Sequence, residues 1–356
     1  MNCELSSWST CAPELREAWG DFASCSSLPV SPFLTWEFFD CVDRVRQDVE
    51  VVVLRESGEV VGCFPFQRRK RRQGLPAAAL LNDLHGPIAV DANNLNFTRV
   101  LRTAELSRFD FHSSPIKPRN CNGYSAHAVP AFRAELGFRA GEYVDCLRGE
   151  RYSVRQQLRK ASAMERNIGP LRLEWRTMDE EVFAALQSWK SLQYQAMGIV
   201  DLFAIPWTCE LLRRLLSLES NSVHGQLSAL YAGNVLVAVH YGLRCGDTLH
   251  SWFPAYSLEY AKYSPGMELF LQLAARGPSE GVTTLDLGYG AEPFKEKLTN
   301  RHYSVQCGSV DLLPWRQKLS AWSRSARQQA KKIPLSKGMK RVIRRASTTL
   351  DPIRYL

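Results

Sequence analysis

The 356-residue chain has no long apolar run, and stretches such as Val235 to Val239 are only of strand length. A membrane-spanning helix needs about 20 apolar residues, so the sequence predicts none. The N-terminal stretch MNCELSSWST lacks the basic start and apolar core of a signal peptide, which favours a cytoplasmic location. The ten cysteines form no CxxC pair and no cluster with histidine. Neither a disulfide scaffold nor a metal site is therefore expected.

Acidic residues are nearly absent from the C-terminal stretch, where twelve Lys/Arg residues from Arg316 onward stand against the single acid Asp351. The rest of the chain is almost neutral, so the net charge of +9 belongs to this tail. Its apolar residues fall near helical spacing: Leu319, Trp322, Ala326, Ala330 and Ile333. This pattern suits a basic amphipathic helix on an anionic membrane surface. A disordered tail and a non-specific nucleic-acid contact are the alternatives.

Length and pattern predict an α/β protein with mixed sheets, in two domains over 1–150 and 151–312, followed by the basic tail 313–356. Two hairpins share one plan of apolar strand, short turn and apolar strand, with turns at Ser57-Gly58 and Gly233-Asn234. This echo suggests two related domains, although any two hairpins can look alike. The stretch from about 104 to 130 is expected to be rich in loops.

A strand over 248–256, a helix after residue 264 and a strand near 284–289 predict a right-handed crossover. The helix begins Ser264-Pro265-Gly266-Met267. Ser at the N-cap and Pro at the first helical position are ordinary start signals. Glycine next to them removes a side chain, which either lets a phosphate approach the free N–H groups or belongs to a plain helix start.

The segment VAVHYGLRCGDTLHSWFPAYSLEYAKYSPGMELFLQLA, followed by LDLGYGAEPFKEKL, resembles the CelD-type acetyltransferase-like domain of the GNAT superfamily. That family is related to the FemAB-type transferases and is often tied to cellulose or other exopolysaccharide synthesis. The likeness is best over residues 152–307. In the first half it extends more weakly through SPFLTWEFFD and NDLHGPIA. The last family motif departs here, with Ala291 in place of Asp and Phe294 in place of Tyr.

The resemblance implies tandem GNAT-like domains and transfer of an acyl group from acetyl-CoA or another acyl-CoA. In GNAT folds the turn before the helix cradles the pyrophosphate of the donor, which assigns donor binding to Ser264, Pro265, Gly266 and Met267. The implied acceptor is a small molecule, a saccharide or a lipid-linked saccharide in exopolysaccharide or cell-envelope synthesis.

Acyl transfer needs a group that accepts the proton of the nucleophile. His240 is one candidate, because small residues share its strand face and its ordinary pKa suits proton transfer; a hydrogen-bonded histidine in a sheet is the structural alternative. Asp286 at a strand end is another, with a turn carboxylate as its alternative. Lys295 would pair with an anionic acceptor or lie on the helix surface.

Substrate contacts are expected from Asp83 and His85 in a loop, from Trp252, and from Arg155 and Arg159 on one helix face. A turn and a solvated helix face are the structural alternatives. A simple hairpin turn at Cys245-Gly246 pairs His240 with Ser251, whereas a shift of one residue pairs it with His250.

Two other functions stay open. One is a Fem-like transferase that uses aminoacyl-tRNA, which tight tRNA binding through Arg155 and Arg159 would favour. The other is a non-catalytic, membrane-associated binding protein on a GNAT scaffold, which the changes at Ala291 and Phe294 permit.

Overall fold

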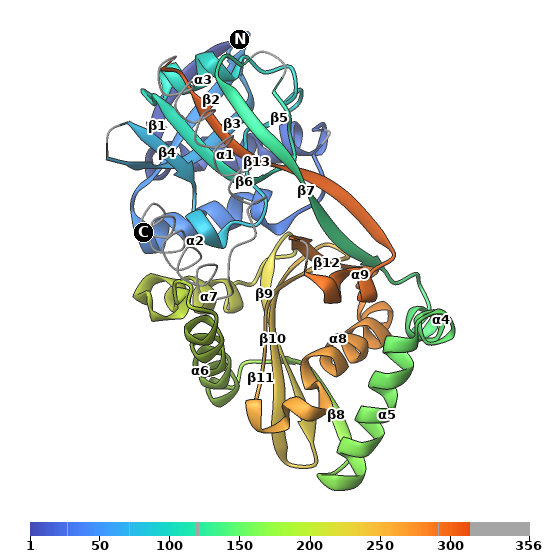
Figure 1. Cartoon of the computed structure of the whole chain (residues 1–356). Coiled ribbons are helices and arrows are strands. Elements are labelled where there is room, and N and C mark those ends of the chain that lie inside the picture. The colour runs from blue at the N-terminus through green and yellow to red at the C-terminus, as the bar shows by residue number, and fades with distance from the viewer. Residues whose placement is uncertain (27, 71, 119–120, 291, 314–356) are drawn as a thin grey trace, which may run out of the picture.

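The computed structural model describes residues 1–26, 28–70, 72–118, 121–290 and 292–313. The predicted basic tail from residue 314 on, and Ala291, lie outside these described residues. The chain forms two α/β halves, drawn at the top and bottom of Figure 1. No helix among the described residues is both long and apolar enough to cross a membrane.

The first half contains β1 (Asn2–Ser7), α1 (Trp8–Ser24), α2 (Trp36–Arg46), β2 (Val49–Glu56), β3 (Glu59–Arg69), β4 (Gln73–Pro76), β5 (Ile88–Ala89), α3 (Phe97–Thr103), β6 (Arg108–Ser114) and β7 (Tyr124–Glu135). Two further helices, α4 (Glu142–Glu150) and α5 (Tyr152–Asn167), lead into the second half. That half contains β8 (Leu171–Thr177), α6 (Glu180–Met197), α7 (Pro206–Leu216), β9 (His224–Ala232), β10 (Val235–Cys245), β11 (Thr248–Tyr256), α8 (Pro265–Arg276), β12 (Thr284–Tyr289), α9 (Pro293–Leu298) and β13 (Arg301–Asp311).

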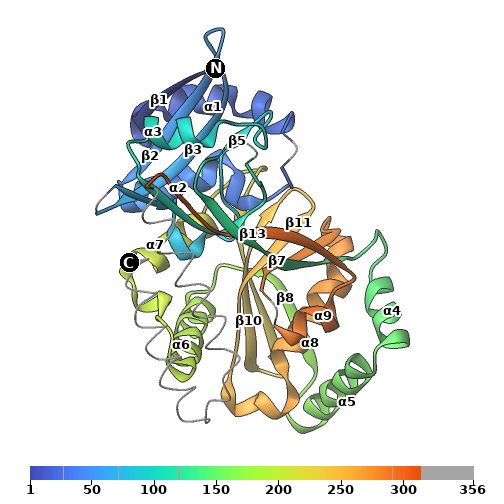
Figure 2. The ribbon, with the colours of Figure 1, turned by 45° about the horizontal axis from the view of Figure 1, so that its top comes forward.

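The two halves exchange their last strands. The sheet order is β1-β2-β3-β4-β6-β13-β7-β12-β11-β10-β9-β8, so β13 pairs with β6 of the first half and β7 pairs with β12 of the second. The exchanged strands also pair with each other, antiparallel, over 124–133 and 301–310. Both run across the junction between the halves (Figures 1 and 2). A single sheet therefore passes through both halves.

The two hairpins noted in the sequence occupy equivalent places in the two halves. Each has a two-residue turn, at Ser57-Gly58 in the β2–β3 hairpin and at Gly233-Asn234 in the β9–β10 hairpin. Each also carries an extra residue at the third position after the turn, Val61 in β3 and Val237 in β10. A shared bulge at a shared position is a specific feature, so the structure favours an internal duplication over coincidence.

The two halves differ clearly in the strand and helix of the crossover. Strand β4 has 4 residues and helix α3 has 7, whereas the corresponding β11 has 9 and α8 has 12. In the first half the chain after β4 instead forms an irregular segment that contains Asp83 and His85. The full strand–helix crossover is thus present in the second half only.

Local signals explain many element boundaries. Helix α6 begins at Asp179, whose carboxylate accepts a hydrogen bond from the Glu181 N–H, and ends at Gly198 in the left-handed conformation. The buried face of α6 packs with α7 and with β10 and β11 in one hydrophobic core that continues into α1 and α2 of the first half. A second core lies between α5, α8 and the other face of that sheet.

The expectation of loops up to residue 130 is wrong. Residues 108–114 and 124–135 form β6 and β7. Strand β7 has the sequence YSAHAVPAFRAE, in which Pro130 and four alanines conceal the strand signal. It is a strand because both neighbours, β12 and β13, pair with it.

The strand exchange gives a stability prediction at Gly308. A Cβ atom on Gly308 would lie 2.2 Å from the Ser125 carbonyl oxygen and 2.6 Å from the Ala126 Cα, both backbone atoms of β7. We expect Gly308→Ala to lower the free energy of unfolding by about 2–3 kcal/mol, since the two strands must move apart. Urea unfolding measures the change.

The matched control is Gly20→Ala in helix α1, where a Cβ meets nothing within 4 Å. That variant should be stabilised by up to about 1 kcal/mol. Equal effects of the two alanines would mean that close β7–β13 contact does not hold the halves together.

Candidate active site

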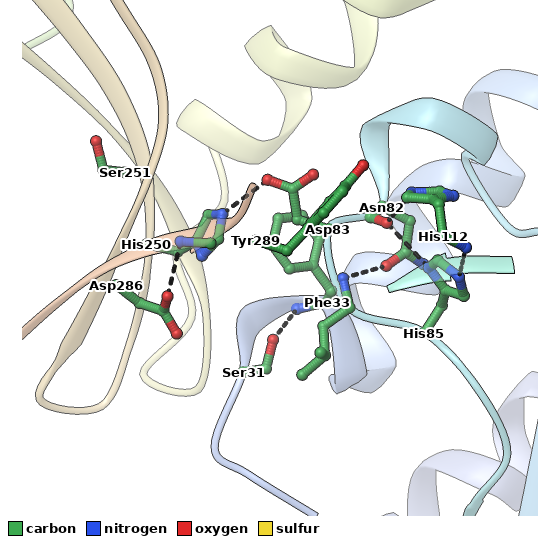
Figure 3. A network of polar contacts seen from close by, with 12 residues as sticks. Ser31, Phe33, Asn82, Asp83, His85, His112, His250, Ser251, Asp286 and Tyr289 are labelled. Atoms are coloured by element: carbon green, nitrogen blue, oxygen red, sulfur yellow. Dashed lines mark hydrogen bonds and ion pairs between the residues drawn. The ribbon is translucent and has the colours of Figure 1, made fainter. Parts of the chain in front are cut away.

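The candidate site lies where β11 and β12 stop pairing. The two parallel strands are in register from Thr248/Thr284 to His250/Asp286. Beyond this point β11 stays paired with β10 up to Tyr256, whereas β12 turns toward β7, where Tyr289 pairs with Ala131. The strands therefore diverge immediately after His250. The loop of the first half that contains Asp83 meets them there (Figure 3).

His250 and Asp83 form a hydrogen-bonded pair between the two halves. The distance from His250 Nε2 to Asp83 Oδ2 is 3.0 Å, and the side chains are 5% and 22% exposed. An ionised carboxylate can only accept, so the imidazole donates its Nε2–H and keeps its lone pair on Nδ1. A histidine oriented in this way by a carboxylate is suited to accept a proton.

The Asp83 loop is held by the buried residues on either side of it. The main-chain carbonyl of Asn82 accepts hydrogen bonds from His85 Nδ1 and from His112 Nε2, each at 3.0 Å. His85 Nε2 accepts the His112 backbone N–H at 3.2 Å. Burial lowers the pKa of both imidazoles, so they stay neutral. His85, predicted to touch substrate, thus fixes the loop, from which Asp83 reaches His250 of the second half.

Asp286 is buried and fully engaged by neighbours. Its carboxylate accepts the Gly288 N–H at 2.8 Å and the Tyr303 hydroxyl at 3.0 Å, and Arg133 lies 3.4 Å away. Arg133 comes from β7 and Tyr303 from β13. The carboxylate therefore ties both exchanged strands to the end of β12.

Lys295 is buried rather than on the surface of α9. Its Nζ donates to the Tyr289 carbonyl at 2.6 Å and pairs with Glu292 at 3.0 Å. Together with Asp286 it holds the turn from Gly288 to Tyr289, and Figure 3 shows Tyr289 beside Asp83. Phe294, by contrast, is exposed.

His240 points away from the Asp83 side of the sheet. The hairpin turn falls at Gly246-Asp247, with Cys245 paired with Thr248, and a bulge makes Trp252 an extra residue of β11. His240 is therefore in register with Pro254, and neither pairing predicted for it occurs. Its Nε2 lies 2.9 Å from Ser251 Oγ, and Figure 3 shows Ser251 directed away from His250. Burial lowers the pKa of His240 to about 3, with the charges of His250 and Lys190 adding to the effect. A buried imidazole of this kind resists protonation.

Trp252 is 8% exposed and packs in an aromatic cluster across the junction. Its ring centroid lies 5.2 Å from that of Phe33 of the first half, and Phe33 contacts the His250 ring edge-on at 4.8 Å. Trp252 thus packs against Phe33, which in turn contacts His250.

The helix start at Ser264 has two features of interest. Ser264 adopts the left-handed conformation with φ 54°, which is uncommon for a residue other than glycine, and its Oγ receives a hydrogen bond from Lys160 Nζ at 2.8 Å. At Gly266 a Cβ would lie 3.2 Å from the Tyr256 ring, so packing also favours a small residue there. Lys160 brings a positive charge to this turn.

The two predicted arginines of α5 are placed differently. Arg155 donates to the carbonyls of Arg148 and Gly149 at 3.0 Å each, and so closes the end of α4. Arg159 is exposed on the same helix as Lys160.

Among the residues placed by the structure, no group of three or more His, Cys, Asp or Glu side chains converges as metal ligands would. His250 was not among the bases predicted from the sequence. Its partner Asp83 lies 167 positions away, and no local pattern reports a contact across that separation.

Comparison with known proteins identifies part of the chain. Residues 148–296 match the family described as "Acetyltransferase (GNAT) domain". No curated protein gives a significant match. The match covers this segment alone, less than half of the chain, and it indicates an enzyme of the acyltransferase class.

Solved structures share the whole two-part fold. The C-terminal DUF2156 domain assigned to a lysylphosphatidylglycerol synthetase from Agrobacterium fabrum superposes with a TM-score of 0.53 at 12% identity, over 88% of this chain and 96% of that one. FemX gives 0.53 at 10% identity, over 88% and 97%. A conserved protein from Bacteroides thetaiotaomicron gives 0.51 at 11% identity, over 84% and 97%. At these identities the likeness shows the fold alone.

Gly288 provides a test of how the site is held together. It has φ +67°, and a Cβ there would lie 3.1 Å from His250 Cε1 and 3.5 Å from Asp83 Oδ2. Gly246 has φ +59° with nothing within 4 Å of a Cβ. Alanine should cost about 1 kcal/mol of stability at either position through strain.

Only Gly288→Ala should also displace His250. Histidine ring NMR reads this directly, with His250 assigned from its substituted variant. If Gly246→Ala moves the His250 signals as much as Gly288→Ala does, Gly288 is not packed against the pair.

Proposed function

We propose that the chain transfers an acyl group from a coenzyme A thioester to an amine or hydroxyl acceptor, with His250 as the base and Asp83 as its partner. The observation that carries the proposal is the Asp83–His250 pair at the point where β11 and β12 diverge. The pair joins the two halves, so the acceptor would lie at their junction.

The chemistry needs no covalent enzyme intermediate. The nucleophile of the acceptor forms a bond to the acyl carbon, its proton passes to His250 Nδ1, and the C–S bond breaks to release the thiolate. Asp83 stabilises the imidazolium that forms. His250 then gives this proton to the thiolate, which leaves as the free thiol of coenzyme A. His250 is preferred to His240 for this role because His240 lies on the other side of the sheet and resists protonation.

The donor is proposed to lie along the full crossover of the second half. The diverging edge of β11 offers backbone groups to the amides of the coenzyme arm, as an added strand would use them. The turn of Ser264, Pro265, Gly266 and Met267 would face the phosphates, with Lys160 as their counter-charge and Arg159 beside it. Asp286 and Lys295 are proposed as positioning residues, because they hold the Gly288–Tyr289 turn beside the pair.

The acceptor class is proposed to be a saccharide or lipid-linked saccharide of exopolysaccharide or cell-envelope synthesis, which rests on the sequence resemblance. A Fem-like aminoacyl-tRNA donor is the second candidate, favoured by the shared fold with FemX. Contact of the tail with an anionic membrane belongs to the same proposal.

The donor proposal is tested by calorimetric binding of acetyl-CoA to the wild type and to Lys160→Glu. In the wild type, Lys160 Nζ lies 2.8 Å from Ser264 Oγ. A glutamate in its place should weaken acetyl-CoA binding about 10–100-fold, because it repels the phosphates. Arg166→Glu makes the same charge change at another exposed position of α5 and should alter the affinity less than threefold.

Two results would contradict the proposal. Equal losses in both variants would indicate only a general electrostatic effect. An absence of acetyl-CoA binding by the folded wild type, together with tight binding of aminoacyl-tRNA, would replace coenzyme A with the second candidate.

A further inference from the structure

A lysine interrupts the buried stripe of helix α6. Val182, Phe183 and Leu186 face the sheet and are buried. Four residues after Leu186 the same stripe continues with Lys190, and four residues later with Tyr194. A position that continues an apolar stripe toward a sheet normally holds an apolar residue. The lysine at this position of α6 therefore needs an explanation other than packing.

No carboxylate is recorded near the ammonium group of Lys190 among the described residues. Its Nζ lies 3.4 Å from Gln193 Oε1 and 5.6 Å from the centre of the Tyr194 ring. In the described part of the chain no carboxylate forms an ion pair with it within 4 Å. Burial lowers the pKa of this amine to about 8, with no neighbouring charge contributing. A partly buried cation without a partner is costly, which is typical of a site that a ligand completes.

Ring contacts connect the neighbour of Lys190 on α6 with the site described above. The Tyr194 ring centroid lies 6.3 Å from that of Phe203, Phe203 lies 5.1 Å from Phe253, and Phe253 stacks on Trp252 at 4.8 Å. The charge of Asp83 contributes to the raised pKa of Tyr194, after the larger effect of burial. Lys190 and Tyr194 are neighbours on α6, and α6 packs on β10 and β11 in the core that also holds Phe33 and Trp252. The site-facing end of α6 therefore lies on the Asp83 side of the sheet.

The other cations near the site already have partners. Arg133 pairs with Asp286, and Lys295 pairs with Glu292 and the Tyr289 carbonyl. Arg155 is held by two main-chain carbonyls. Of these, none offers an uncommitted charge to an incoming anion, whereas Lys190 does.

We infer that Lys190 Nζ forms a subsite for an anionic group of the acceptor, a carboxylate or a phosphate, beside the Asp83–His250 pair. This inference rests on the proposed function, since it names the class of acceptor for the same site. An ammonium between an amide oxygen and an aromatic ring has donors left for such an anion. The acceptor is thus an acidic or phosphorylated molecule that carries its nucleophilic amine or hydroxyl toward His250.

The test follows the NMR signal of the Lys190 side chain, which responds to an anion bound at its amine. Protein labelled with 13C at lysine Cε is titrated with inorganic phosphate, and separately with acetate, at constant ionic strength. The Lys190 signal is assigned by its loss in Lys190→Met, or in Lys190→Arg if the first variant does not fold. We expect a saturable shift of the Lys190 signal at millimolar anion, and no comparable shift of the exposed Lys117.

The two arms separate the two anions. A shift with phosphate alone assigns a phosphorylated acceptor, a shift with acetate alone a carboxylated one, and a shift with both the shared chemistry. A Lys190 signal that moves no more than that of Lys117 with either anion overturns the subsite. If that result comes with intact acetyl-CoA binding, the subsite fails while the proposed function stands; a wild type that binds no acetyl-CoA makes the proposed function fail instead.

Discussion

The antiparallel pairing of β7 with β13 is the contact on which the rest of the structure depends. Each strand belongs in sequence to one half and completes the sheet of the other. Because the two strands also pair with each other, main-chain hydrogen bonds fix the relative position of the halves, in addition to the side-chain contacts across the junction. Arg133 and Tyr303, one from each strand, then converge on Asp286. Backbone register thereby places a loop of one half against a strand of the other.

A shared plan with one difference at the crossover explains why the site uses both halves. The two hairpins have the same turn length and a bulge at the same position. The first half has a short strand and a short helix in place of the long crossover, and the chain between them includes the loop that carries Asp83. The second half kept the crossover and supplies His250 at its divergence point. One half thus provides the proposed donor site and the other a partner for the base.

Local features of the site could be predicted from the sequence, and contacts over long separations could not. The hairpin at Gly233-Asn234 followed from its turn residues, and the start of α8 followed from Pro265, although the Ser264 side chain does not cap the helix. Strand β7 was missed because Pro130 and its alanines give no β pattern, and only pairing on both sides makes it a strand. The hairpin register, with Cys245 paired with Thr248, places His250 opposite Leu243, and a shift of two residues in a turn leaves little signal in a single sequence. Tyr256, close to the Cα of Gly266, is a packing neighbour that the sequence did not indicate.

The central claim is that Asp83 and His250 act as one unit across the junction. A double-mutant cycle of urea unfolding on Asp83→Ala, His250→Ala and the double variant tests it most directly. The account predicts a coupling free energy of about 0.5–3 kcal/mol, because either single change removes the same hydrogen bond. Effects of the single changes that add to within about 0.3 kcal/mol would contradict the account, since residues that do not touch behave in this way.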